Sequence, residues 1–186
     1  MEVQPTSLNG VLLIQPRVFS DDRGWFMENW RREHYEAMGI PEPFVQTNSS
    51  HSSQGVIRGL HYQWPEPQGK LVWVSQGEVF DVAVDIRHDS PQFGQWVGVV
   101  LDAQAHQQLW IPPGFAHGFQ VLSPTATFHY QCTAPYRREH DRAIDCGDSD
   151  IGVQWPLAID GLSEKDQQAP TLGEISDSQL PSCASC

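Results

Sequence analysis

Short apolar runs separated by turn residues recur along most of the chain and predict a fold built from β-strands. In residues 78–86, the side chains of Phe80, Val82 and Val84 alternate with those of Asp81 and Asp85, which is the period-two pattern of a strand. Turn signals rich in Gly, Pro, Asn, Asp and Ser recur about every eight to twelve residues, a spacing that favours a β-sandwich or barrel. The predicted strands are residues 11–14, 45–48, 56–60, 71–75, 78–86, 96–101, 108–111, 115–122 and 126–132.

One or two short helices interrupt the strands. Residues 30–38 contain no Gly or Pro, Asn29 is suited to cap them, and Gly39 is suited to end them. A second helical turn is predicted at residues 162–167, where Ser163 is suited to be the cap. Since no repeat or linker divides the chain, we expect a single all-β domain.

Composition, net charge and the absence of long apolar runs argue against some classes of protein. Hydrophobic residues make up 39% of the 186 residues and charged residues 18%, which is typical of a globular domain. The net charge of −12 argues against non-specific binding of nucleic acid, which requires a basic surface. No apolar run approaches the roughly 20 residues of a membrane helix, and no secretory signal opens the chain, so we expect a cytoplasmic protein without a membrane segment.

Two basic segments are candidates for chemistry. Arg58, Gly59 and His61 lie close together at the end of a predicted strand, where an unbroken strand would point Arg58 and His61 to opposite faces. Either a bulge at Gly59 brings both side chains to one side, or the two serve different sites. Lys70 begins an apolar strand and is one of only two lysines in the chain, so its position is informative.

Two aromatic segments are further candidates. After a Pro-Pro-Gly turn, alternation places Phe115, His117 and Phe119 on one face, where a buried imidazole must have a partner or line a pocket. In residues 128–132, Tyr130 shares a face with Phe128, a pattern that many half-buried strands show and that is not specific.

The sequence gives little support to metal, redox or acyl-transfer chemistry. No His-x-His pair occurs, although metal-binding barrels usually carry one, and neither a Gly-rich nucleotide loop nor a Gly-x-Ser-x-Gly elbow is present. A metal-dependent cupin enzyme and a non-catalytic sugar-binding jelly roll remain alternatives at this point.

Five segments together resemble the dTDP-4-dehydrorhamnose 3,5-epimerase family, and the resemblance runs from about residue 10 to residue 172. The segments are residues 58–63, 68–72, 77–87, 108–112 and 114–119. The resemblance implies a cupin-type jelly roll in a single domain of residues 1–172, followed by a mobile tail of residues 173–186. It also implies a homodimer with exchanged N-terminal strands, no cofactor, and epimerisation of a dTDP-linked 4-keto-6-deoxy hexose at carbons 3 and 5.

The resemblance implies roles for individual residues. His61 matches the general base, Tyr130 the general acid, Asp166 the carboxylate paired with the base, and Lys70 the residue near the keto oxygen. Asp141 stands at a contact position where the family usually has Glu, so the charge is kept and the reach is shortened. A single-site epimerase of a related dTDP-4-keto-6-deoxy sugar remains an alternative. The other implied substrate contacts are Arg23, Glu28, Gln46, Asn48, Arg58, His117 and Lys165, and Lys70 is counted among them as well.

Overall fold

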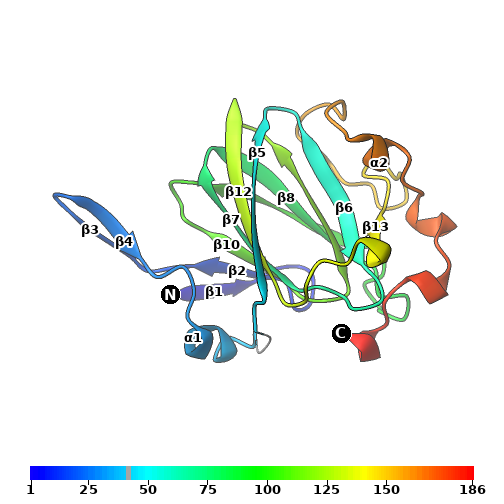
Figure 1. Cartoon of the computed structure of the whole chain (residues 1–186), viewed down its shortest axis with the longest axis horizontal. Helices are drawn as coiled ribbons and strands as arrows, with labels where there is room; N and C mark the ends of the chain where they lie inside the picture. The colour runs from blue at the N-terminus through cyan, green and yellow to red at the C-terminus, as the bar shows by residue number, and fades with distance from the viewer. Residues whose placement is uncertain (41–42) are drawn as a thin grey trace.

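Two antiparallel sheets face each other in the computed structural model, which describes residues 1–40 and 43–186 (Figure 1). The arrangement confirms the predicted all-β jelly roll. The six-stranded sheet contains, in spatial order, β1 (Glu2–Pro5), β2 (Leu12–Gln15), β10 (Gln108–Ile111), β7 (Lys70–Gln76), β12 (Thr125–Cys132) and β5 (Gln46–Ser53). The five-stranded sheet contains β13 (Asp141–Ala143), β6 (Ile57–Gln63), β11 (Phe115–Val121), β8 (Glu78–Asp85) and β9 (Trp96–Asp102).

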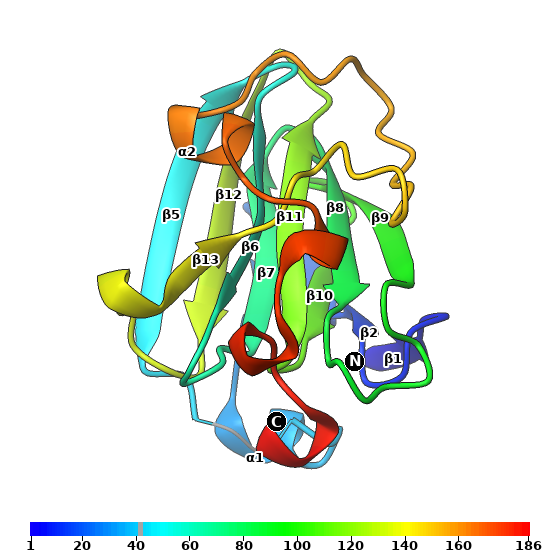
Figure 2. The ribbon, with the colours of Figure 1, turned by 90° about the vertical axis from the view of Figure 1, so that its right-hand side faces the viewer.

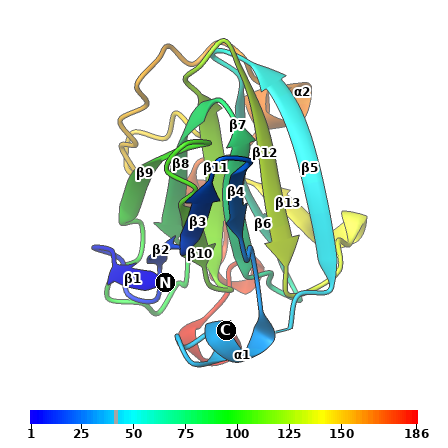
Figure 3. The same cartoon turned by 90° about the vertical axis from the view of Figure 1, so that its left-hand side faces the viewer.

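All nine predicted strands are present, and four further strands were not predicted. Strands β3 (Val18–Asp21) and β4 (Gly24–Met27) pair only with each other in a hairpin that projects from the sandwich (Figures 1 and 3). The other two, β1 and β13, are edge strands without a fully buried residue. Because none of these strands buries one face regularly, their sequences lack the alternation that identifies a strand.

The main core lies between the two sheets. Val72 and Phe128 from the six-stranded sheet pack there with Ala83, Phe119 and Val121 from the five-stranded sheet. The alternation of residues 78–86 reflects the two faces of β8. Val82 and Val84 point to the outer face of the sheet, where they belong to a second core. As both faces of β8 are covered, even Asp81 and Asp85 are buried.

The C-terminal third of the chain covers the outer face of the five-stranded sheet (Figure 2). Ile144, Leu172 and Leu180 are buried there, and Trp64 Nε1 donates a hydrogen bond to the carbonyl of Ser178. The predicted tail of residues 173–186 therefore has defined contacts with the sheet. That the tail is mobile stays a prediction. This region contains α2 (Glu164–Gln167) and the short 3₁₀ helices Arg138–His140, Leu172–Glu174, Asp177–Gln179 and Cys183–Ser185.

Helix α1 (Arg32–Glu36) packs on the outer face of the six-stranded sheet, where Tyr35 is fully buried. The prediction that Asn29 caps this helix was wrong. The N-cap is Arg31 and makes no side-chain cap hydrogen bond, while the backbone carbonyl of Asn29 accepts a hydrogen bond from the Tyr35 hydroxyl. The helix thus begins two residues later than predicted. No helix in residues 1–40 and 43–186 is long and apolar enough to cross a membrane.

Candidate active site

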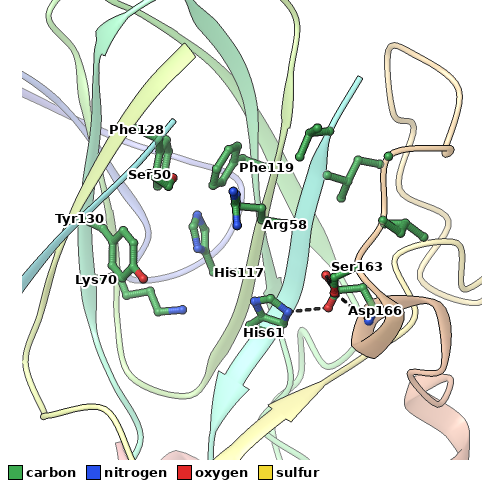
Figure 4. A pocket seen from close by; sticks show the side chains of 14 residues that line it. Ser50, Arg58, His61, Lys70, His117, Phe119, Phe128, Tyr130, Ser163 and Asp166 are labelled. Carbon is green, nitrogen blue, oxygen red and sulfur yellow. Dashed lines mark hydrogen bonds and ion pairs between the residues drawn. The ribbon is translucent and has the colours of Figure 1, made fainter. Parts of the chain in front are cut away.

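A cavity of about 580 Å³ opens between the two sheets, with side chains from both sheets pointing into it (Figure 4). A smaller hollow of about 270 Å³ adjoins it and shares His61, Lys70 and Tyr130. These three residues therefore lie where the two spaces meet. The labelled residues of the larger cavity are Ser50, Arg58, His61, Lys70, His117, Phe119, Phe128, Tyr130, Ser163 and Asp166.

A bulge in β6 brings Arg58 and His61 to the same cavity. His117 of β11 pairs with His61, but Phe119 pairs with Arg58, so two steps on β11 match three on β6. Gly59 lies within this interval at φ +129°, and a Cβ atom there would lie 2.5 Å from the Cα atom of Gly118. The bulge alternative is thereby confirmed, and only glycine fits the position.

His61 and Asp166 form a hydrogen-bonded pair on one wall of the cavity. Nε2 of His61 lies 2.6 Å from Oδ1 of Asp166, whose side chain is buried. Ser163 holds the carboxylate from the other side: its hydroxyl donates to Oδ2 at 2.8 Å, and its Oγ accepts the Asp166 backbone N–H as the cap of α2. The predicted cap is confirmed. Since Nε2–H donates to the carboxylate, Nδ1 of His61 is the nitrogen free to accept a proton.

The hydrogen bonds around Asp166 keep it charged. Burial alone would raise the pKa of Asp166, but the hydrogen bonds from His61 and Ser163, together with the charge attraction of His61 and Lys165, outweigh burial and hold the pKa below its ordinary value. The pair therefore places a fixed negative charge behind the imidazole, where it stabilises the ring once a proton arrives.

Tyr130 and Lys70 stand on the opposite wall, on β12 and β7 of the six-stranded sheet (Figure 4). Burial raises the pKa of Tyr130, so its hydroxyl keeps its proton at neutral pH. Burial likewise lowers the pKa of Lys70, and no carboxylate of the described residues forms an ion pair with its ammonium group. The wall facing His61 thus offers a proton donor and a cation without a fixed partner.

A second imidazole–carboxylate pair lies deeper, and the sequence predicted only half of it. Nε2 of His117 lies 2.9 Å from Oδ2 of Asp81, and both side chains are buried. Burial lowers the pKa of His117, so the ring is neutral near pH 7. His117 stacks on Phe128, and Phe119 stacks on the same ring, which confirms the predicted aromatic face. Asp81 was missed, because a polar residue in an alternating strand normally faces solvent.

Most of the other predicted contact residues line the smaller hollow. The Gln46 amide donates to Oδ1 of Asn48 at 3.0 Å, so these two share a face of β5 as expected. Lys165 Nζ lies 2.6 Å from Oδ2 of Asp141, which also accepts the Tyr136 hydroxyl at 3.2 Å. Tyr136 escaped sequence reasoning because it lies in an irregular loop without periodicity.

Arg23 and Glu28 are the predicted contact residues that lie away from both spaces. Arg23 pairs with Asp21 at the tip of the projecting hairpin, and Oε1 of Glu28 lies 2.9 Å from Nδ1 of His34 at its base. The same hairpin exposes a group of aromatic side chains, which comprises Phe19, Trp25 and Phe26. Within one chain, the hairpin contributes nothing to the cavity among the described residues.

The titratable residues do not gather as a metal site requires. Among residues 1–40 and 43–186, no three side chains of His, Cys, Asp or Glu converge as potential ligands. The two imidazoles of the cavity each hydrogen-bond a separate carboxylate instead. The residues present are suited to proton transfer between fixed donors and acceptors.

Comparisons with known proteins show the family of this chain. A family model described as dTDP-4-dehydrorhamnose 3,5-epimerase matches residues 5–174. A dTDP-4-dehydrorhamnose 3,5-epimerase from Pseudomonas aeruginosa is 49% identical over 94% of this chain and 97% of its own. A crystal structure of a dTDP-6-deoxy-D-glucose-3,5-epimerase from Legionella pneumophila, in complex with dTDP-4-keto-L-rhamnose, superimposes with a TM-score of 0.95 at 47% identity, covering 97% of each chain.

A more distant neighbour has a different stated specificity. The structure of a 3'-monoepimerase from Streptomyces bikiniensis in complex with dTDP-quinovose has a TM-score of 0.90 at 34% identity, covering 97% of this chain and 93% of its own. The same fold thus accommodates epimerases that act at one carbon and epimerases that act at two.

Proposed function

Because the chain belongs to the dTDP-4-dehydrorhamnose 3,5-epimerase family, we propose that it converts dTDP-4-dehydro-6-deoxy-D-glucose to dTDP-4-dehydro-L-rhamnose. The conversion inverts carbons 3 and 5 of the hexose. The observation that carries the proposal is the position of His61 on one sheet and Tyr130 on the other, facing each other across one cavity (Figure 4).

The chemistry requires a base and an acid on opposite faces of the sugar ring. The ketone at carbon 4 makes the hydrogens at carbons 3 and 5 acidic, because the resulting anion spreads onto the ketone oxygen. Removal of a proton from one face and its return to the other inverts the carbon. No electron is gained or lost overall, so the reaction needs no redox cofactor.

His61 is the proposed base. Its Nδ1 accepts the proton, while Nε2–H remains bound to Asp166, whose charge stabilises the imidazolium. An imidazole releases a proton again near neutral pH, so the base can be reset between the two epimerisations.

Tyr130 is the proposed acid, and Lys70 the proposed partner of the ketone oxygen. The phenol stays protonated because burial raises its pKa, yet it can protonate a strongly basic enolate carbon. The ammonium group of Lys70 stabilises the negative charge that develops on oxygen, a contribution of roughly 3 kcal/mol if it acts like one oxyanion donor.

The remaining contact residues are proposed to hold the nucleotide and the outer part of the sugar. Arg58 provides a guanidinium for an anionic group, and His117 a neutral ring in the cavity wall. In the adjoining hollow, Gln46, Asn48, Asp141 and Lys165 offer donors and acceptors, and Tyr136 offers an exposed aromatic ring.

We also propose that two chains form a homodimer and exchange their N-terminal strands. The support is the projecting hairpin, which exposes Phe19, Trp25 and Phe26 and carries Arg23 far from the cavity of its own chain. In an exchanged dimer, Arg23 and Glu28 would reach the cavity of the second copy. A cytoplasmic location completes the proposal, and the four unpaired cysteines agree with a reducing compartment.

Incubation with dTDP-4-dehydro-6-deoxy-D-glucose in deuterated water, followed by NMR of each carbon, tests the function. We expect deuterium at both carbon 3 and carbon 5 and formation of the L-rhamnose product. Incorporation at one carbon alone would identify a monoepimerase, as in the Streptomyces neighbour. Binding of the nucleotide sugar without any incorporation would show a non-catalytic binding protein and overturn the proposal.

A further inference from the structure

The tail carries two cysteines on one turn, outside the site described above. The tail crosses the outer face of the five-stranded sheet and ends in the 3₁₀ helix Cys183–Ser185, which Cys186 directly follows (Figure 2). In the described part of the chain, both cysteines are exposed and neither is in a disulfide. Neither lines the cavity or the adjoining hollow, so the proposed proton transfers do not use them.

Hydrogen bonds within the turn hold the two cysteines at a short spacing. The backbone N–H of Ser185 donates to the carbonyl of Ser182 at 3.1 Å, and the N–H of Ser182 donates to Oγ of Ser185 at 2.9 Å. In such a turn, side chains three residues apart lie on the same side, with Cα atoms about 6 Å apart. Disulfides span Cα separations of roughly 4.4–6.8 Å. A disulfide can therefore join Cys183 and Cys186 without unwinding the turn.

The loop after β8 holds the start of the turn. The backbone N–H of Cys183 donates to Oδ1 of Asp89 at 2.7 Å. Two residues before the cysteine, the carbonyl of Pro181 accepts the backbone N–H of His88 at 3.0 Å. These two contacts attach the turn to the body of the protein, so the position of Cys183 is defined by the fold.

The sulfur of Cys186 packs on the backbone of Gly114. A Cβ atom at Gly114 would lie 2.6 Å from Sγ of Cys186 and 2.8 Å from Cγ of Arg87, so glycine leaves room for both side chains. The guanidinium of Arg87 is itself fixed: its Nε–H donates to Oδ1 of Asp85 at 2.9 Å, and it lies 4.7 Å from the centre of the Phe115 ring. The second thiol thus also has a defined place, beside a cation.

We propose that Cys183 and Cys186 form a reversible redox pair, which closes to a disulfide by exchange with a small disulfide such as oxidised glutathione. One thiolate attacks the small disulfide and releases a small thiol, and the second cysteine then attacks the mixed disulfide and releases another. Two electrons pass from the protein dithiol to the small disulfide, whose two sulfurs take up the two protons. The inference is independent of the proposed epimerisation.

The exchange should be slow near neutral pH. Desolvation raises the pKa of both thiols, and the Asp89 carboxylate adds to this at Cys183, although the positive charge of Arg87 acts in the opposite direction. Few thiolates are then present to attack, which limits the rate of exchange. The position of the equilibrium depends instead on how well the turn brings the two sulfurs together, so the test measures an equilibrium.

The test equilibrates the full chain without oxygen in mixtures of reduced and oxidised glutathione. Samples are quenched in acid, unfolded and alkylated, and the mass of the protein gives the number of free thiols. We expect four alkylated cysteines in the reduced protein and two in the oxidised protein, with peptide mapping locating the bond between Cys183 and Cys186. The buried Cys132 and Cys146 are internal controls and should be alkylated in both.

We expect half-oxidation when the squared concentration of reduced glutathione, divided by that of oxidised glutathione, is on the order of 10 mM. A turn that is already formed should exceed the roughly millimolar effective concentration of a flexible linker. The matched control is Cys183→Ala/Ala184→Cys, which keeps the composition but places the two thiols two residues apart, on different sides of the turn. Its midpoint should fall about tenfold or more, because a strained disulfide is more easily reduced.

Equal midpoints for the wild type and this control would overturn the inference, because the turn would then not orient the thiols. A product with glutathione bound to one or both cysteines, in place of the internal bond, would overturn it as well. So would a disulfide between two chains as the main product, which a non-reducing gel detects.

Discussion

Oδ1 of Asp166 lies 2.6 Å from Nε2 of His61, although 105 positions separate the two residues in the sequence. His61 lies on β6, within the five-stranded sheet, and Asp166 on the short helix α2, which follows that sheet in the chain. The contact fixes which nitrogen of the imidazole carries the proton and which one faces the cavity. The proposed base therefore depends on a loop-and-helix segment that contributes no strand to the sandwich.

Replacement of the base itself gives the sharpest outcome. We expect His61→Asn to abolish solvent deuterium exchange at carbons 3 and 5 together, since one base serves both positions in the proposed mechanism. NMR in deuterated water measures the exchange, and thermal unfolding confirms that the variant is folded. Exchange at the wild-type rate in the folded variant would disprove the assignment of His61.

Removal of the charge behind the imidazole should slow the reaction without preventing binding. The side-chain amide of an asparagine at position 166 can either accept a hydrogen bond from the imidazole or donate one to it, so it does not fix the tautomer, and it carries no negative charge. We therefore expect Asp166→Asn to reduce kcat by about 10²- to 10⁴-fold. Steady-state assays with the nucleotide sugar measure this. Glu164→Gln, an exposed substitution in the same helix, is the matched control and should retain full activity.

A variant of the proposed acid distinguishes proton removal from proton delivery. Tyr130→Phe leaves His61 in place, so proton removal and solvent exchange should continue, whereas delivery of a proton to the opposite face should fall about 10²-fold. NMR distinguishes deuterated starting sugar from inverted product in one experiment. An unchanged yield of inverted product would remove Tyr130 from the role of acid.

The pH dependence of the reaction should report on Lys70. Because burial lowers its pKa, the ammonium group loses its charge at a lower pH than an ordinary lysine, and kcat/KM should fall on the alkaline side accordingly. Lys70→Arg keeps a positive charge at high pH, so the alkaline fall in kcat/KM of this variant should occur at a higher pH, while its maximal rate is lower. Identical alkaline limbs in the two pH profiles would show that another group is responsible.

The bulge in β6 gives a prediction about stability. At Gly59, with φ +129°, a Cβ atom would lie 2.5 Å from the backbone of Gly118, so Gly59→Ala should destabilise the fold by about 3 kcal/mol or more. Gly173→Ala is the matched control, because its Cβ would meet no atom within 4 Å, and its effect should stay within about 0.5 kcal/mol. Denaturant unfolding measures both, and equal stabilities would contradict the bulge geometry.

The local pattern of the sequence determined the strands that form the sandwich. Alternation identified β8 and the face of β11 that carries His117, and a capping serine identified α2, because each of these signals depends only on neighbouring residues. The same reasoning missed the hairpin of β3 and β4, whose strands bury no regular face. It also placed the cap of α1 at Asn29, because a local pattern does not include the tertiary contacts, such as the Tyr35 hydroxyl on the Asn29 carbonyl, that place residues 29–31 before the helix.

Contacts between distant residues depend on the three-dimensional fold. The sequence contains Asp81 as one polar residue of an alternating strand, and nothing local indicates that its side of the sheet faces inward to His117. Whether Arg58 and His61 share a face depended on the register between β6 and β11. Residue types and strand periods are properties of a segment, whereas pairing across sheets depends on strand order and register, which are set by burial over the whole chain.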